Sequence, residues 1–229
     1  MKLPIALALD APDLDTAKSW TSQTSPYVST LKIGLETYLR DGKSAINEIR
    51  KISDCDIFLD LKLHDIPATV AGACHSVKDL NPKYLTVHAS GGFEMISEAV
   101  KALPNTLITA VTILTSLNDE GLKNVGFNLS PGESAIKLAK LAVAAGARAI
   151  VCSALEVSKI REAVGKDVVL ITPGIRPAGS ISDDQKRVAT PSQALKDGAN
   201  LLVIGRPITS SDSIQNACEQ LRQEINNIK

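Results

Sequence analysis

The sequence contains the stretch Gly146-Ala147-Arg148-Ala149-Ile150-Val151, which recurs in form as Gly198-Ala199-Asn200-Leu201-Leu202-Val203. In both copies a glycine that can end a helix in the left-handed conformation comes just before a short apolar run that is typical of a strand. The repeated pattern predicts a helix that leads directly into a buried strand.

The same alternation extends over the whole chain. Apolar, β-rich segments occur at residues 5–9, 28–33, 57–61, 84–88, 107–112, 149–152, 168–171 and 201–204. The segments between them have apolar residues three or four positions apart, as in Ile214, Cys218, Leu221 and Ile225. Continuous apolar strands are typical of a parallel sheet covered by helices. The pattern predicts an α/β protein, a (β/α)8 TIM barrel with a single domain over residues 1–229.

An open, doubly wound sheet is the alternative architecture. A dinucleotide-binding sheet of that kind needs the pattern G-x-G-x-x-G after its first strand, whereas Leu9 is followed here by Asp10-Ala11-Pro12-Asp13. No linker or low-complexity segment indicates a second domain. The barrel is therefore the better interpretation.

Composition excludes several classes of function. The 229 residues include 25 Lys+Arg and 25 Asp+Glu, so the net charge is zero, and only 3% of residues are aromatic. Nucleic-acid binding proteins usually carry a basic surplus or aromatic stacking platforms, so we expect no nucleic-acid partner. The four cysteines are far apart without a C-x-x-C pair, which argues against a disulfide scaffold or zinc site.

The N-terminal apolar run could be mistaken for a signal peptide. It is short, contains Pro4 and ends at Asp10 rather than at a small-residue cleavage site, so we interpret it as a strand. No stretch approaches the roughly 20 apolar residues of a membrane span. We expect a cytoplasmic protein without a membrane partner.

Charged residues of alternating sign end the first three predicted strands: Asp10, Lys32, Asp60 and Lys62. In barrel enzymes the chemistry lies at these strand ends. Asp60 and Lys62 share one face of their strand, and Asp65 follows at the next turn. Neighbouring carboxylates favour a protonated lysine, which can donate a proton to a carbanion. A rim network of salt bridges without catalysis is the alternative, and the position of Lys32 on the adjacent strand favours a site.

The last two strands are followed by candidate phosphate-binding loops. These are Pro173-Gly174-Ile175-Arg176-Pro177 and Gly205-Arg206-Pro207-Ile208-Thr209. Barrels commonly bind phosphate here through backbone N–H groups, and each arginine adds charged hydrogen bonds. The long polar stretch over residues 176–190 suggests a lid, with a disordered surface excursion as the alternative.

The histidines do not have the spacing of a metal site. His75 lies in a helical stretch, and His88, at the end of a strand, is interpreted as a structural residue. Gly91-Gly92 remains without a role.

The run from Asp60 to Thr69, Asp-Leu-Lys-Leu-His-Asp-Ile-Pro-Ala-Thr, resembles the signature of the orotidine 5′-phosphate decarboxylase family. Supporting matches, in the family's order from the first strand to the last, are Leu9-Asp10, Lys32-Ile33-Gly34, Leu114-Thr115-Ser116, Pro173-Gly174-Ile175-Arg176 and Ile204-Gly205-Arg206-Pro207-Ile208. The core D-x-K-x-x-D alone is shared with related sugar-phosphate enzymes. Its extension through Asp-Ile-Pro-Ala-Thr, together with the phosphate motifs, is more specific.

This resemblance implies a cofactor-independent carboxy-lyase that converts orotidine 5′-monophosphate to uridine 5′-monophosphate and CO2, the last step of de novo pyrimidine synthesis. It implies that Lys62 protonates C6, that Asp60 lies against the departing carboxylate, and that Lys32 and Asp65 complete the charged array. In a homodimer, Asp65 and Thr69 would serve the neighbouring subunit's site.

The resemblance also implies the substrate contacts. Asp10 and Lys32 would bind ribose hydroxyls, Thr115 and Ser116 the pyrimidine edge, and Arg176, Gln185, Gly205 and Arg206 the phosphate, with Gln185 on the lid. Two other functions stay open: a magnesium-dependent sugar-phosphate decarboxylase or aldolase that shares D-x-K-x-x-D, and a barrel that binds nucleotide without turnover.

Overall fold

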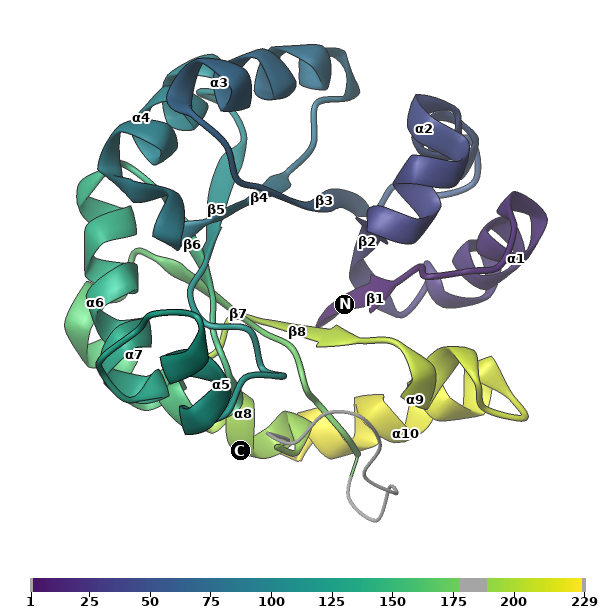
Figure 1. Cartoon of the computed structure of the whole chain (residues 1–229). Helices are drawn as coiled ribbons and strands as arrows, with labels where there is room; N and C mark the ends of the chain where they lie inside the picture. Colours follow the sequence, from purple (N-terminus) through teal and green to yellow (C-terminus); the bar gives the residue numbers. More distant parts are fainter. Residues whose placement is uncertain (1, 178–188, 228–229) are drawn as a thin grey trace.

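Eight parallel strands form a closed barrel in the computed structural model, which describes residues 2–177 and 189–227 (Figure 1). The strands are β1 (Leu3–Ala8), β2 (Val28–Gly34), β3 (Asp56–Leu63), β4 (Tyr84–His88), β5 (Leu107–Val111), β6 (Ala149–Val151), β7 (Val169–Thr172) and β8 (Leu201–Ile204). Each strand pairs with its neighbours along the chain, and β1 pairs with β8 to close the barrel. The predicted (β/α)8 architecture is confirmed.

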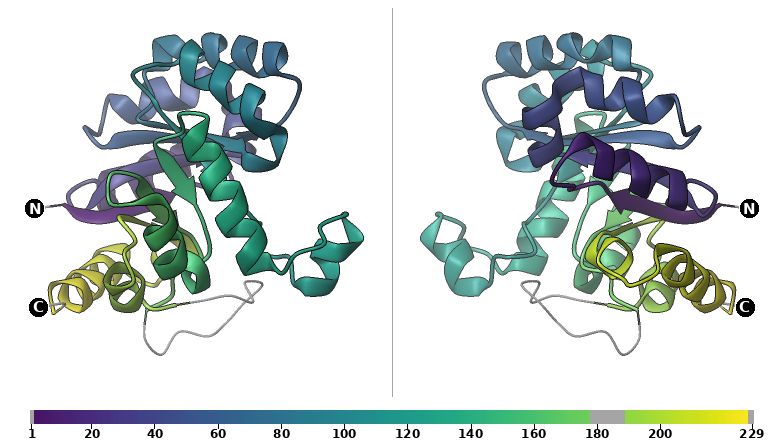
Figure 2. Two further views of the ribbon diagram at one scale, coloured as in Figure 1. Left: turned by 90° about the vertical axis from the view of Figure 1, so that its left-hand side faces the viewer. Right: turned by 90° about the vertical axis from the view of Figure 1, so that its right-hand side faces the viewer.

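Helices surround the barrel on its outer side (Figure 1). They are α1 (Leu14–Thr24), α2 (Leu35–Arg50), α3 (Pro67–Ser76), α4 (Gly92–Ala102), α5 (Asp119–Asn124), α6 (Pro131–Ala144), α7 (Val157–Val164), α8 (Pro191–Lys196), α9 (Arg206–Thr209) and α10 (Ile214–Asn226). Short 3-10 helices are η1 (Lys78–Leu80), η2 (Ala89–Gly91) and η3 (Ala154–Glu156). The short helices α5 and α9 lie in βα loops, and the sequence pattern did not predict them. Figure 2 shows α5 standing away from the barrel.

Local sequence accounts for the ends of the helix before β6. Ser130 caps α6 through a reciprocal capping box with Glu133. At the other end Gly146 has φ of 98°, and the corresponding Gly198 before β8 has φ of 108°. Both glycines therefore adopt the left-handed conformation that the repeated stretch predicted, and each directs the chain from a helix into a strand.

The core has two layers. One layer fills the space between the strands and the outer helices, and it contains most of the buried apolar side chains. The other lies inside the barrel, where Phe58 packs on Tyr84 with ring centroids 5.5 Å apart. Phe58 lies two residues before Asp60 on β3, so this apolar plug forms the floor beneath the charged residues. The open end of the barrel lies above it.

Within the described residues, no helix is long and apolar enough to cross a membrane.

Candidate active site

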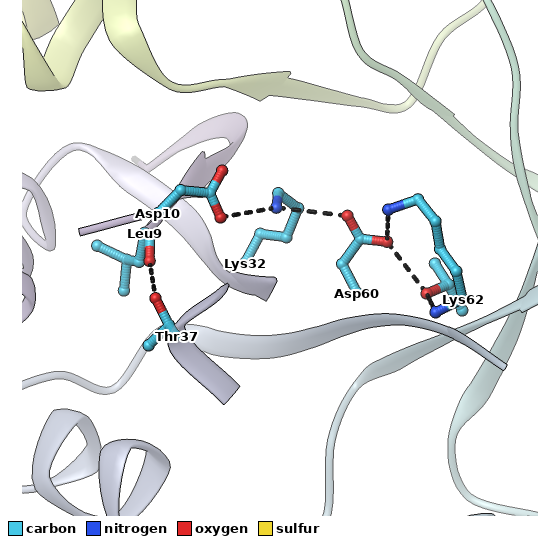
Figure 3. Close-up of polar contacts among 7 residues, drawn as sticks. Leu9, Asp10, Lys32, Thr37, Asp60 and Lys62 are labelled. Atoms are coloured by element: carbon cyan, nitrogen blue, oxygen red, sulfur yellow. Dashed lines mark hydrogen bonds and ion pairs between the residues drawn. The ribbon is translucent and has the colours of Figure 1, made fainter. Parts of the chain in front are cut away.

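Four charged side chains form a row of alternating sign across the ends of β1, β2 and β3 (Figure 3). Lys32 Nζ lies 3.5 Å from Asp10 Oδ1 and 3.3 Å from Asp60 Oδ2. Lys62 Nζ lies 2.8 Å from Asp60 Oδ1. The parallel register brings these strand ends to one edge, with Gly34 of β2 opposite Asp60 of β3. The predicted gathering of these four residues is therefore found in the structure.

The centre of this row is buried. The side chains of Lys32 and Asp60 are 9% and 13% exposed. Burial raises the pKa of the Asp60 carboxyl, but the ammonium groups of Lys32 and Lys62, with hydrogen bonds from Lys62 and Thr86, outweigh it and hold the pKa below its ordinary value. Asp60 is therefore a carboxylate that balances two ammonium groups.

The row forms the border between two neighbouring cavities, which share lining residues. One, of about 180 Å³, has apolar walls that include Val111, Ile113 and Val151, and Lys62 and Thr115 also line it. The other, of about 360 Å³, is lined by Asp10 and by residues of the loops after β7 and β8. Lys32 and Asp60 line both cavities. The site thus offers an apolar compartment at one end and a polar one at the other.

The polar compartment contains the predicted phosphate-binding residues Gly174, Arg176, Gly205 and Arg206. Backbone hydrogen bonds join the described residues on either side of positions 178–188. Arg176 N donates to the carbonyl of Ala189 at 3.0 Å, and Ala189 N donates to Gly174 O at 3.2 Å. This contact holds the backbone next to Arg176 beside the cavity.

Other predicted site residues lie outside the row. The Asp65 carboxylate accepts a hydrogen bond from the backbone of Ile66 at 2.6 Å and makes no ion pair with Lys62 within the described chain. Thr69 is exposed on α3, and Ser116 is exposed in the loop after β5. Gln185 and most of the predicted lid, residues 178–188, lie outside the described residues. The row of charged side chains within one chain consequently includes Asp60 but not Asp65.

Sequence reasoning missed Thr86 on β4. Its buried hydroxyl contacts both Asp60 and the backbone of Lys62. The sequence did contain a sign of this position: Tyr84, Thr86 and His88 are alternate residues of β4, so all three side chains point toward the barrel interior. His88, interpreted from the sequence as a structural residue, packs against His64 with ring centroids 5.3 Å apart.

The arrangement suits chemistry on an anionic substrate that has one reacting end and one phosphate end. Ammonium groups fixed beside an apolar compartment stabilise negative charge that develops there more strongly than water does. In the ranges 2–177 and 189–227, no group of three or more His, Cys, Asp or Glu side chains has the arrangement of a metal site.

Comparison with known proteins points to a single family. Residues 4–221 match the family model described as "Orotidine 5'-phosphate decarboxylase / HUMPS family". A protein of Thermobifida fusca named orotidine 5′-phosphate decarboxylase is 54% identical over 225 residues, covering 98% of this chain and 97% of its own. A protein of the same name from Gluconobacter oxydans is 43% identical and covers 95% of each chain.

A solved structure agrees with the sequence comparisons. The crystal structure of orotidine 5′-phosphate decarboxylase from Lactobacillus acidophilus superposes with a TM-score of 0.84 at 34% identity, covering 97% of this chain and 99% of the other. Since the family model spans almost the whole barrel, this chain belongs to the orotidine 5′-phosphate decarboxylase / HUMPS family.

Proposed function

We propose that this chain is a carboxy-lyase that removes CO2 from orotidine 5′-monophosphate without a cofactor, and that Lys62 protonates C6 of the pyrimidine. Membership of the family supports decarboxylation of this nucleotide in pyrimidine biosynthesis. The observation that carries the role of Lys62 is its ammonium group, which lies 2.8 Å from Asp60 and lines the apolar compartment.

The charge row supports the proton transfer. As the bond between C6 and the carboxylate carbon breaks, its electron pair stays on C6, and CO2 leaves as a neutral molecule. Lys62 Nζ gives C6 a proton and is re-protonated later from solvent. The carbanion at C6 is poorly delocalised, so ammonium groups that are already in place stabilise it without solvent reorganisation. Asp60 pairs with Lys62 at 2.8 Å and would lie beside the substrate carboxylate.

The polar compartment supports binding of the phosphate. Arg176 and Arg206 offer charged hydrogen bonds, and Gly174 and Gly205 let the backbone come close to an anion. Binding at this remote group supplies free energy that can hold the pyrimidine in the apolar compartment. Asp10 and Lys32, which lie between the two ends, would bind the ribose hydroxyls, and Thr115 with Ser116 the pyrimidine edge.

The direct test follows CO2 release from orotidine 5′-monophosphate by purified protein in EDTA. We expect turnover to persist in EDTA and to disappear in Lys62→Ala, with retained binding of uridine 5′-monophosphate. Lys101→Ala is the matched control, because the only ion pair that this exposed lysine makes among the described residues is with Glu98 on its own helix. Turnover by Lys62→Ala would refute the proposed acid, and loss of turnover in EDTA would favour the magnesium-dependent class. Binding without turnover in the unmodified protein would favour the nucleotide-binding barrel.

Phosphate recognition has a separate test. Arg206→Ala is expected to weaken binding of uridine 5′-monophosphate by about 1–3 kcal/mol, the range for a lost charged hydrogen bond. Uridine, which has no phosphate, should bind both proteins equally. An equal loss for uridine would refute the assignment of Arg206 to the phosphate.

We also propose a homodimer in which Asp65 and Thr69 serve the partner's site. Asp65 is exposed and is not paired with Lys62. Its neighbour Ile66 is 66% exposed, and Leu39 on α2, the helix that precedes β3, is 79% exposed. An exposed apolar side chain next to Asp65, which makes no ion pair with Lys62 of its own chain, supports an interface between two copies at this face.

Mixing two inactive variants tests the shared site. Lys62→Ala and Asp65→Ala chains, refolded together in equal amounts, would form heterodimers with one intact site, so roughly a quarter of the activity should return. Each variant alone should stay inactive. If activity does not return although differently tagged chains copurify as mixed dimers, Asp65 does not act across the interface.

A cytoplasmic location remains part of the proposal. The four cysteines are buried and unpaired, as is common in a reducing compartment.

A further inference from the structure

Strand β3 is distorted where it carries the charged residues. Its pairing with β4 is regular up to Leu59 and Leu85, and the next pair is Leu63 with Val87, so β3 has two additional residues between these pairs. Lys62 lies in this bulge with φ of 51°. A lysine disfavours the left-handed conformation, so contacts from elsewhere in the fold must hold it there.

One side chain from β4 makes those contacts. The hydroxyl of Thr86 accepts a hydrogen bond from the backbone N–H of Lys62 at 2.8 Å. Because an N–H group can only donate, the hydroxyl proton is free to point the other way, and it donates to Asp60 Oδ1 at 3.1 Å. This same oxygen accepts from Lys62 Nζ at 2.8 Å. Thr86 thus connects the Asp60 carboxylate to the backbone of Lys62, and the side chain of Lys62 pairs with the same carboxylate.

We propose that Thr86 is a positioning residue for the reaction. It fixes the bulge of β3 and the rotation of the Asp60 carboxylate together, so that the ammonium of Lys62 points into the apolar compartment. The inference rests on the proposed role of Lys62 as the acid. Thr86 is fully buried on the inner face of β4 and acts only through its neighbours.

A second threonine provides a matched comparison. Thr109 on β5 is the direct strand partner of Thr86 and is equally buried. Its hydroxyl donates to the carbonyl of Leu107 in its own strand and has no contact with Asp60 or Lys62. Replacing either threonine with valine removes one buried hydroxyl at the same depth of the barrel. Only Thr86→Val removes the link to the charged row.

The experiment measures kcat, KM, affinity for uridine 5′-monophosphate and the unfolding midpoint for three variants. Thr86→Val should lower kcat by about 10- to 100-fold, since a small displacement of a reacting group has an effect of this size. Its affinity for uridine 5′-monophosphate should change by less than about threefold, because the phosphate contacts remain. Thr86→Ser, which keeps the hydroxyl, should restore most of kcat. Thr109→Val should keep kcat within about threefold of the unmodified protein, whatever its unfolding midpoint.

Several results would overturn the inference. These are a kcat for Thr86→Val equal to that of Thr109→Val, an equal loss in Thr86→Ser, or a loss of kcat matched by a loss of nucleotide affinity. If Thr86→Val does not fold, Thr86→Cys replaces it, and the weaker thiol donor should give a kcat below that of Thr86→Ser. If Thr86→Val is active and Lys62→Ala is inactive, the positioning role of Thr86 is refuted and the role of Lys62 as the acid is not. An active Lys62→Ala would refute the acid and this inference with it.

Discussion

Gly34 gives a perturbation whose size can be worked out from the structure. It ends β2 opposite Asp60, with φ of −88° and ψ of −175°, a conformation that alanine adopts without strain. A Cβ atom at this position would lie 2.7 Å from Asp10 Oδ1 and 3.1 Å from Lys32 Nζ. Gly34→Ala therefore acts through steric contact with the charged row and leaves the backbone unstrained.

The stability of the fold should change little. Ordinary contact begins near 3.4 Å, so the Asp10 carboxylate must move by about 0.7 Å. The side chain of Asp10 is 48% exposed and can rotate into solvent. Replacing glycine also removes entropy from the unfolded chain, which stabilises by about 0.4–1 kcal/mol. We expect the free energy of unfolding to stay within about 1 kcal/mol of the unmodified value.

Activity should change much more. If Asp10 binds the ribose, its displacement removes a charged hydrogen bond of about 1.5–3 kcal/mol. This corresponds to a fall in kcat/KM of roughly 10- to 150-fold. Lys32 is confined by burial and can retreat less than Asp10 can. The variant should thus be a stable protein with a damaged site.

The assay compares kcat/KM and thermal unfolding of Gly34→Ala with those of Gly132→Ala. Gly132 lies in α6, and apart from its chain neighbours and the backbone of its own helix no described atom lies within 4 Å of its added Cβ, so it reports the entropy effect. Full activity in Gly34→Ala would refute the reasoning that Asp10 must hold its position. Loss of the fold would instead refute the assignment of the clash to a movable side chain.

Three further outcomes are expected. Asp60→Asn leaves Lys32 without its nearer carboxylate, so urea titration should show the free energy of unfolding lowered by about 3 kcal/mol. Asp79→Asn, which breaks an exposed ion pair, should lower it by less than about 1 kcal/mol. Arg161 donates to backbone carbonyls of three residues around β7 and α8, so Arg161→Ala should lower the melting temperature, with a loss of about 2–4 kcal/mol. Burial, a neighbouring histidine and a nearby lysine lower the pKa of His88 below 6.5, so the folded state resists protonation of this residue. The melting temperature should therefore fall as pH drops below about 6.5. His88→Gln should reduce this fall.

The strands could be predicted from sequence because their signals are local. Each of the eight predicted segments agrees with an observed strand to within two residues at either end. Buried parallel strands need apolar residues on both faces, and a glycine such as Gly146 marks where the preceding helix stops. The positions of Asp10, Lys32 and Asp60 at strand ends then followed from the architecture.

The features that sequence reasoning missed depend on contacts between distant residues. The left-handed conformation of Lys62 is supported by Thr86, which lies 24 positions away on another strand. Simple alternation along β3 predicted one shared face for Asp60 and Lys62 but could not reveal the bulge in which both residues lie. Asp65, only three residues beyond Lys62, is separated from it because the chain turns into α3 and the carboxylate bonds to the backbone of Ile66.

Small uncharged residues control the geometry of the charged row. Alternating sign lets several ionised groups share one partly buried site, since like charges in contact would shift their protonation instead. Attraction alone leaves the row free to adjust, because each long side chain can approach its partner in several ways. Gly34 limits this freedom at Asp10 by leaving only enough space for the carboxylate, and Thr86 limits it at Lys62 through two directed hydrogen bonds. A change at either residue preserves every charge, so its effect on turnover separates the contribution of position from that of charge.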